Sequence, residues 1–217
     1  MRSKFAKLAQ MVAIGLALTF TFSCSGSNDP EGVDDNGGGG NNQSGGGSCS
    51  ISSGETVTIG SQTWMSKNLN CNVVGSKCYN NEQANCSKYG RLYTWEAAKS
   101  ACPSGWHLPS DEEWEVLVNS VGGSSTAGTK LKATSDWDKN GNGTDTEGFR
   151  ALPGGFGFGY GSLSGVFDGV GVTGYWWSVT EFGASEASYH HMYYGANVNS
   201  IRNGVKANFL SVRCVKN

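Results

Sequence analysis

The chain has 217 residues, and 16 Lys and Arg oppose 18 Asp and Glu, which gives a formal net charge of −2. This balance excludes nucleic acid as a partner, because binding to phosphates needs a cationic surface. The 33 glycines predict many turns and loops, and the seven cysteines indicate either disulfides or a metal site.

The first segment, residues 1–23, has the layout of a bacterial export signal. Basic residues precede an apolar stretch from Met11 to Phe22, which is too short for a comfortable membrane-spanning helix, and small Ser23 precedes Cys24. Such an ending resembles a lipobox, in which the cysteine receives a lipid. We therefore expect an exported protein that Cys24 anchors to the outer membrane or cell surface, with an ordinary signal peptide as the alternative.

Residues 24–48 consist mainly of Gly, Ser, Asn and Asp and contain almost nothing that can be buried. We expect a flexible acidic tether there. Removal of residues 1–23 lowers Lys and Arg from 16 to 13 against 18 acids, so the formal charge becomes −5. Residues 49–217, roughly 170 in number, are then enough for one domain with a real core.

Six cysteines follow the tether, an even number that favours three disulfides in an oxidising compartment. Zinc is the competing interpretation, but no two of these cysteines are closer than seven positions, whereas zinc sites use close pairs. Six cysteines allow fifteen pairings. We favour a short bridge across a turn-rich loop, a long one from a helix to the last strand, and the remaining pair by elimination: Cys78–Cys86, Cys102–Cys214 and Cys49–Cys71.

The first predicted elements are a hairpin and a helix. Residues 55–69 alternate apolar and polar positions around a Gly-Ser turn, which predicts a β-hairpin. Trp95, Ala98 and Cys102 then recur at helical spacing, and Pro103 disfavours helical geometry at the residue before it. We expect this helix to end at Cys102.

A second helix begins after His107, which we expect to be packed or hydrogen-bonded. Ser110 and Glu113 form an S-x-x-E capping box, and an apolar face follows at helical spacing until Gly122. The acids of its first turns, Asp111 among them, are expected on a solvated face. Residues 127–134 predict a short third helix.

The second half of the chain consists of short apolar and aromatic runs separated by glycine, asparagine and serine, which predict strands and long loops. Two early helices and a strand-rich remainder predict an α+β domain with a mainly antiparallel sheet.

Residues 138–148 begin like a calcium-binding loop. Asp138, Asn140 and Asn142 occupy its first, third and fifth places, and Asp145 offers further oxygens, but the twelfth place holds Phe149 instead of a carboxylate. We prefer a turn held by its own side chains and predict no metal or other cofactor.

Aromatic residues are concentrated in the second half. Adjacent strand residues face opposite ways, so we expect one of Trp176 and Trp177 in the core and the other at the surface. With Tyr160 and Tyr175, the exposed ring would form a platform for sugar rings or for a protein partner. Burial in the core is nevertheless the commoner outcome for such rings.

Several stretches of the chain together resemble one bacterial family. They are "IGSQTWMSKNLN", "CYNNEQANCSKYGRLYTWEAAKSACPSGWHLPSDEEWEVL", "AGTKLKATSDW", "NGNGTDTEGFRALPGG", "GYWWSVTE" and "SVRCVKN". In this order they resemble the Fibrobacter succinogenes major paralogous domain. The resemblance implies exported, lipid-anchored proteins and a C-type lectin-like fold shared with formylglycine-generating enzymes. It also implies a disulfide from a helix to the last strand, here Cys102–Cys214.

The departures from the related families bear on function. The calcium-dependent sugar motifs of C-type lectins do not occur, and each cysteine after the tether has a plausible structural partner, whereas formylglycine-generating enzymes need two reactive cysteines. We therefore predict no catalytic residues and a surface-anchored lipoprotein with a binding or adhesion domain for a polysaccharide or a surface protein. The alternatives are an enzyme of the formylglycine-generating type and a purely structural envelope protein.

Overall fold

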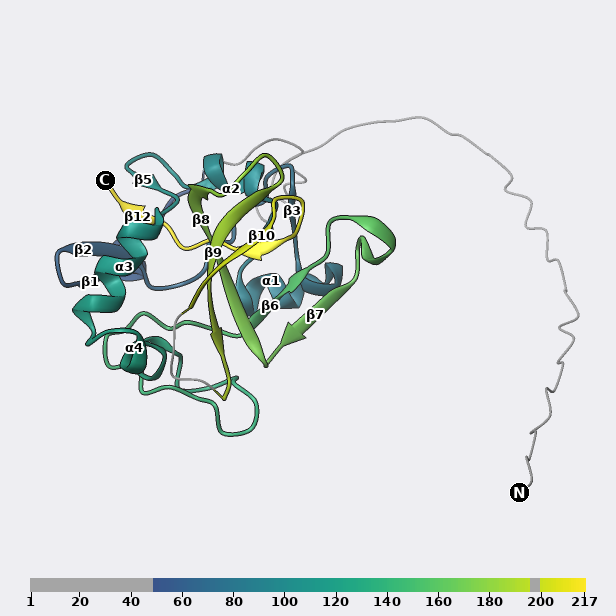
Figure 1. Cartoon of the computed structure of the whole chain (residues 1–217). Coiled ribbons are helices and arrows are strands. Elements are labelled where there is room, and N and C mark those ends of the chain that lie inside the picture. The colour runs from purple at the N-terminus through teal and green to yellow at the C-terminus, as the bar shows by residue number, and fades with distance from the viewer. Residues whose placement is uncertain (1–48, 196–199) are drawn as a thin grey trace, which may run out of the picture. The chain divides into compact units, whose positions relative to one another are not determined.

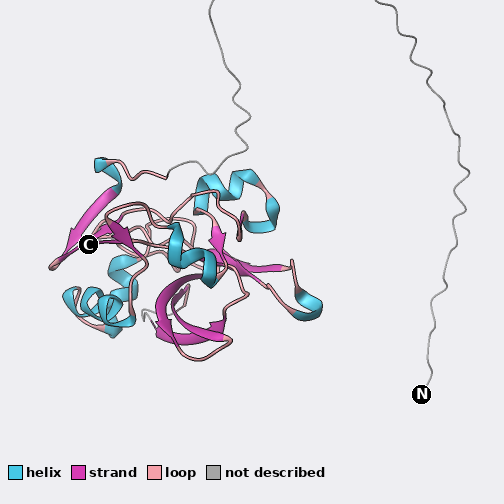
Figure 2. Ribbon diagram, turned by 90° about the horizontal axis from the view of Figure 1, so that it is seen from above, coloured by secondary structure: helices cyan, strands magenta, loops and turns pink. Residues whose placement is uncertain are grey.

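The computed structural model describes residues 49–195 and 200–217, with the side chains of 200–202 left undescribed. The predicted signal segment, Cys24 and the tether therefore lie outside the described residues. Within the described part, four α-helices and two sheets are connected by long loops (Figure 2), which confirms the predicted α+β class.

The predicted hairpin forms from β1 (Thr56–Ile59) and β2 (Gln62–Met65). Gly60 turns the chain with a φ of 59°, a left-handed conformation that glycine adopts without a steric penalty. Two strands from distant parts of the chain, β12 (Val215–Lys216) and β5 (Trp106–His107), complete an antiparallel sheet in the order β1-β2-β12-β5.

Two helices begin and end as their local signals predict. Helix α2 (Trp95–Ala101) starts at Thr94, whose hydroxyl accepts a hydrogen bond from Ala97 N, and ends at Cys102 in extended geometry. Helix α3 (Asp111–Ser120) starts with both halves of the predicted capping box in place. Here local chemistry decides the boundaries, because caps satisfy backbone N–H groups that have no partner inside the helix.

The prediction of two early helices is incomplete. Helix α1 (Gln83–Tyr89) begins inside the stretch 78–86 that we expected to be a turn-rich loop and continues beyond it. It buries Cys86 and Tyr89 and ends at Gly90, whose φ is 80°. Helix α4 (Ser124–Leu131) lies three residues earlier in the chain than the helix predicted for 127–134. It ends at Leu131 because Lys132 returns to extended geometry.

The larger sheet runs through the middle of the domain, with β8 and β9 as its longest strands (Figure 1). It is antiparallel except where β8 pairs in parallel with β11 and with β6 (Gly154–Gly157). β6 in turn forms an antiparallel pair with β7 (Phe167–Val170). The main path of the sheet is β10 (Ser200–Val205), β9 (Glu186–Tyr193), β8 (Thr173–Glu181), β11 (Leu210–Ser211), β4 (Leu92–Tyr93) and β3 (Ser76–Lys77).

Strand β8 separates two parts of the core. Trp176 belongs to a cluster with Trp64, Trp114 and Phe149, whereas Trp177 belongs to a cluster that includes Tyr93. The two side chains do face opposite ways, but both are 0% exposed, so the prediction that one would lie at the surface is wrong. Both faces of β8 are covered by other elements, and each indole N–H donates to a buried oxygen, Trp176 to Asn68 Oδ1 and Trp177 to Tyr93 O.

The six cysteines of the described part form three disulfides, and the pairs are those that we favoured: Cys49–Cys71, Cys78–Cys86 and Cys102–Cys214. The long bridge joins positions 112 residues apart and fixes the end of α2 to the residue that precedes β12. It therefore connects the first half of the domain to its last strand.

Candidate functional site

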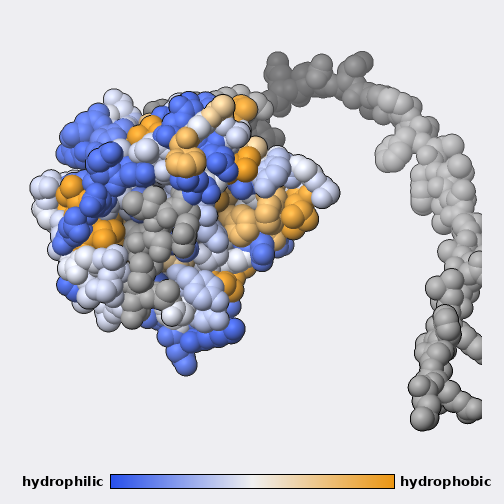
Figure 3. Space-filling model, viewed as in Figure 1, coloured by the Kyte–Doolittle hydropathy of each residue, from blue (hydrophilic) through white to orange (hydrophobic). Residues whose placement is uncertain are grey.

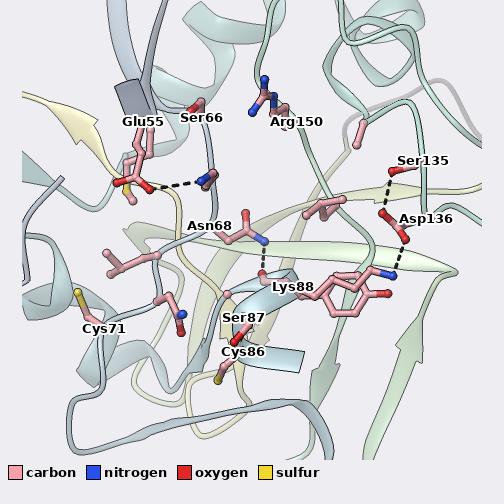
Figure 4. A pocket seen from close by; sticks show the side chains of 18 of the residues that line it. Glu55, Ser66, Asn68, Cys71, Cys86, Ser87, Lys88, Ser135, Asp136 and Arg150 are labelled. Carbon is pink, nitrogen blue, oxygen red and sulfur yellow. Dashed lines mark hydrogen bonds and ion pairs between the residues drawn. The ribbon is translucent and has the colours of Figure 1, made fainter. Parts of the chain in front are cut away.

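One concave region is a groove of about 880 Å³, which we call the polar groove. Its walls come from residues 65–71, from the end of α1 at 86–90, and from two loops at 133–136 and 145–152. Figure 4 shows polar side chains from all of these segments around the opening.

Charged side chains of the polar groove pair with one another. The ammonium of Lys88 lies 2.5 Å from Asp136, and this hydrogen bond lowers the pKa of Asp136 and raises that of Lys88. Two further ion pairs, at 3.4 Å and 3.8 Å, are Lys67–Glu55 and Arg150–Asp145. Because each cation already has an acidic partner, the groove offers no excess of either charge to a ligand.

One wall of the polar groove rests on a buried polar network. Asn68 Oδ1 accepts hydrogen bonds from Trp176 Nε1 at 2.9 Å and from the Arg213 guanidinium at 2.7 Å. Arg213 also donates to the main-chain oxygens of Met65 and Phe149. Burial lowers the pKa of Arg213 to about 9, so the group still carries its charge at neutral pH. These contacts give Asn68 and Arg213 a structural role.

The second concave region, of about 310 Å³, is lined by four aromatic side chains, and we call it the aromatic pocket. The rings belong to Phe156 on β6, Tyr160 in the loop after it, Tyr175 on β8 and Tyr189 on β9. The remaining lining residues come from β9, β10, β11 and the turn before β11: Glu186, Asn203, Gly204, Val205, Asn208 and Leu210.

Ring contacts fix the walls of the aromatic pocket. The centroid of Tyr175 lies 5.1 Å from Phe156 and 5.3 Å from Tyr189, both in edge-to-face geometry, and His191 stacks on Tyr175 at 5.7 Å. A Cβ at Gly204 would lie 2.8 Å from the Tyr189 ring, so only glycine allows this ring to rest on β10. The rings of Phe156, Tyr175 and Tyr189 are therefore held in place before a ligand arrives.

Apolar side chains continue from the aromatic pocket onto the loop between β6 and β7. Tyr160, Leu163 and Val166 are each about half exposed there, with Tyr160 at 51%. In Figure 3 hydrophobic residues gather over this part of the surface. Exposed apolar side chains that adjoin a pocket mark a place where binding partners can bury surface.

The structure brings together two of the four predicted ligand-binding residues. Tyr160 and Tyr175 line the aromatic pocket, whereas Trp176 and Trp177 lie in the core and do not form part of it. Sequence reasoning did not single out Glu186 or the two asparagines of the lining. No local motif marks them, because separate strands and a turn bring them together.

The predicted turn at residues 138–148 uses its own side chains as backbone partners. Asn142 Oδ1 accepts a hydrogen bond from Trp137 N at 3.0 Å, and Asp145 Oδ1 accepts one from Arg150 N at 2.7 Å. The calcium candidates were Asp138, Asn140, Asn142 and Asp145. The oxygens of Asn142 and Asp145 thus accept hydrogen bonds from backbone N–H groups of this part of the chain. Across the described ranges, no three His, Cys, Asp or Glu side chains lie close enough to hold a metal ion.

A serine–histidine–aspartate set is present but buried. His190 Nε2 lies 3.6 Å from Asp111 Oδ1, and the imidazole stacks on Trp114 at 4.8 Å. Burial raises the pKa of Asp111, but hydrogen bonds from His190, Ser178 and Ser188 outweigh it and lower the pKa overall. Asp111 is therefore not the solvated acid that we expected. Because Ser178 and His190 are buried, the set fastens the start of α3 to the sheet and cannot reach a substrate.

His107 is hydrogen-bonded, as expected, at the joint between α2 and α3. Its Nδ1 lies 2.6 Å from Asn217 Oδ1 and its Nε2 lies 2.7 Å from Glu113 Oε1. Burial lowers the pKa of His107, but the hydrogen bonds to Asn217 and Glu113 outweigh it and raise the pKa overall. Glu113 at the same time accepts from Ser110 N in the capping box, so the imidazole ties α3 to the end of the described chain.

A comparison with known families matches residues 57–216 to the Fibrobacter succinogenes major domain. The chain belongs to this family. Searches among curated proteins and among solved structures give no match. The Fibrobacter succinogenes major domain contains the whole aromatic pocket, whereas Cys49, Ser50 and Glu55 of the polar groove precede it. The disulfide Cys49–Cys71 therefore joins a residue outside the family domain to one inside it.

Proposed function

We propose that the protein is a non-catalytic binding or adhesion domain of the C-type lectin-like kind, and that its aromatic pocket holds a sugar ring of a polysaccharide. The observation that carries this proposal is the exposed ring of Tyr160 beside the half-buried ring of Tyr175, with two asparagines in the same lining. A volume of about 310 Å³ lies within the range of roughly 300–1,000 Å³ that is typical of ligand pockets.

The composition of the lining suits a sugar. A sugar ring presents C–H groups on its faces, which pack on aromatic rings, and hydroxyl groups around its edge, which bind side-chain amides. Rings already fixed by edge-to-face contacts lose little conformational entropy on binding. The polar groove has a single aromatic side chain in its lining, Tyr89, and its charged groups are engaged with one another.

Disulfide pairing supports a non-catalytic role over the enzymatic alternative. All six cysteines of the described part are paired, whereas an enzyme of the formylglycine-generating type would need two reactive thiols. Thiol titration of the native, folded protein decides between the two. We expect no free thiol, and two free thiols that respond to copper would favour the enzyme.

The proposal includes anchoring of the domain through a lipid on Cys24, with residues 24–48 as a spacer from the outer membrane or cell surface. Among the residues that the structure describes, no helix has the length and apolar character to cross a bilayer. Metabolic labelling with a fatty-acid analogue tests the anchor. Label should enter the wild-type protein and not Cys24→Ser, and equal labelling of both would contradict it.

Polysaccharide pull-down and a glycan array test the binding role. Tyr160→Ala removes an exposed ring that belongs to none of the core clusters, so the fold should persist while affinity for the bound glycan falls at least tenfold, a loss of about 1.4 kcal/mol. Phe182→Ala is the matched control, because Phe182 is 65% exposed in the turn between β8 and β9, outside the pocket. An unchanged affinity in Tyr160→Ala would refute the pocket as the site. No binding across the array would favour a purely structural envelope protein or a protein ligand.

A further inference from the structure

Among the side chains that the structure describes, the lining of the aromatic pocket contains a single charged residue. Among lining residues whose side chains the structure describes, Glu186 carries the charge, and the others are aromatic, aliphatic, glycine or asparagine. We infer that the pocket selects uncharged sugars and rejects polysaccharides that carry carboxylate or sulfate groups. This inference rests on the proposed function and adds the chemical class of the ligand.

Hydrogen-bonding capacity favours hydroxyl groups over anions. A carboxylate only accepts hydrogen bonds, so Glu186 can bind a sugar hydroxyl, which donates, but not a ligand carboxylate or sulfate. Asn208 Oδ1 accepts from Gly159 N at 3.2 Å, and its amide nitrogen donates to no described residue. Asn203 is exposed at the rim. The two amides supply the donors and acceptors that a neutral hydroxyl edge requires.

Two lysines on described adjoining segments, Lys77 and Lys206, do not compensate this negative charge inside the pocket. Lys206 Nζ contacts the carboxylate of Glu181 and the main-chain oxygen of Gly183, and Lys77 Nζ lies 4.9 Å from the ring centroid of Phe209. Neither lysine belongs to the lining. An anionic sugar would therefore bring a like charge next to Glu186 in a site partly shielded from water, where repulsion is stronger than in bulk solvent.

Matched pairs of ligands test the inference. Glucan, mannan and galactan oligosaccharides of equal length are compared by calorimetry with their counterparts oxidised to carboxylates at C6. For a neutral oligosaccharide that binds, we expect the oxidised counterpart to bind at least tenfold more weakly at low salt. Added salt should reduce this ratio, because it screens the repulsion.

Glu186→Gln removes the charge and keeps a side chain of similar size that still accepts hydrogen bonds, so the ratio of neutral to oxidised affinity should fall below about threefold, whatever the affinity for the neutral ligand itself. Glu115→Gln, an exposed carboxylate on α3 outside the lining, should leave the ratio unchanged. Equal or tighter binding of the oxidised ligands, or an unchanged ratio in Glu186→Gln, would overturn the inference and leave sugar binding intact. No binding by any member of the panel would overturn the proposed function itself, and the inference with it.

Discussion

Replacement of Asn68 by leucine removes the acceptor on which the buried polar network depends. Asn68 Oδ1 receives the indole N–H of Trp176 and two nitrogens of the fully buried Arg213 guanidinium, at 2.9, 2.7 and 3.2 Å. Each neighbour lies too deep for water to replace the lost oxygen. We expect Asn68→Leu to lower the free energy of unfolding by about 2–4 kcal/mol, because two buried donors, one of them charged, lose a shared acceptor while Arg213 keeps its main-chain acceptors.

A double-mutant cycle isolates the interaction. Arg213→Met removes the charge, so in the double variant Asn68→Leu no longer leaves a guanidinium without its acceptor. The two losses should therefore be less than additive, by about 1–3 kcal/mol. The control Asn70→Leu changes a neighbouring exposed asparagine of the same groove wall and should alter stability by less than about 0.5 kcal/mol.

Urea denaturation with the disulfides intact, followed by the fluorescence of the seven tryptophans, measures all four members of the cycle. Additivity within about 0.5 kcal/mol would refute the reasoning, because it would show that Asn68 and Arg213 do not share their contribution. A loss below about 1 kcal/mol for Asn68→Leu alone would do the same.

Three further predictions concern the long disulfide, the joint and the cap of α3. Serine at both Cys102 and Cys214 should lower the free energy of unfolding by about 4–5 kcal/mol in the loop-entropy model, because 112 residues separate the two positions. A loss of less than about 1 kcal/mol in denaturant titrations would contradict this. The raised pKa of His107 should add stability that is fully present below its unfolded pKa of about 6.5 and is lost as pH rises through the folded value. This gain should stay under about 1 kcal/mol because the ring is partly exposed, and unfolding curves at acidic and alkaline pH should show it in wild type but not in His107→Gln. Ser110→Ala should lower the stability by about 1 kcal/mol, measured as a fall in Tm, whereas an unchanged Tm would mean that the capping box contributes little.

Elements set by neighbouring residues were predictable from the sequence. The capping box at Ser110 and Glu113 and the stop before Pro103 act over one helical turn, and both helices have the expected ends. Helix α1 was missed because its residues resemble a turn, and it depends on burial of Cys86 and Tyr89 against the rest of the domain. That burial is a tertiary effect, which a local pattern does not contain.

The candidate site was only partly predictable for the same reason. Alternation along β8 correctly places Trp176 and Trp177 on opposite faces, but it does not show that both faces are covered. Tyr175 packs edge-to-face against Phe156 and Tyr189 and stays partly exposed at the pocket. Glu186 and Asn208 line the same pocket as Tyr175 because of the order of the strands in the sheet. A single sequence does not reveal which strands become neighbours.

Sugar binding at the aromatic pocket is tested most directly by amide chemical-shift mapping during titration with a neutral oligosaccharide that the array identifies. The largest shifts are expected at Tyr175, Tyr189, Gly204 and Asn208, with little change at Asn68 or Asp136. Shifts concentrated at Asn68 and Asp136, in the polar groove, would show that the ligand binds elsewhere and would contradict the assignment of the site.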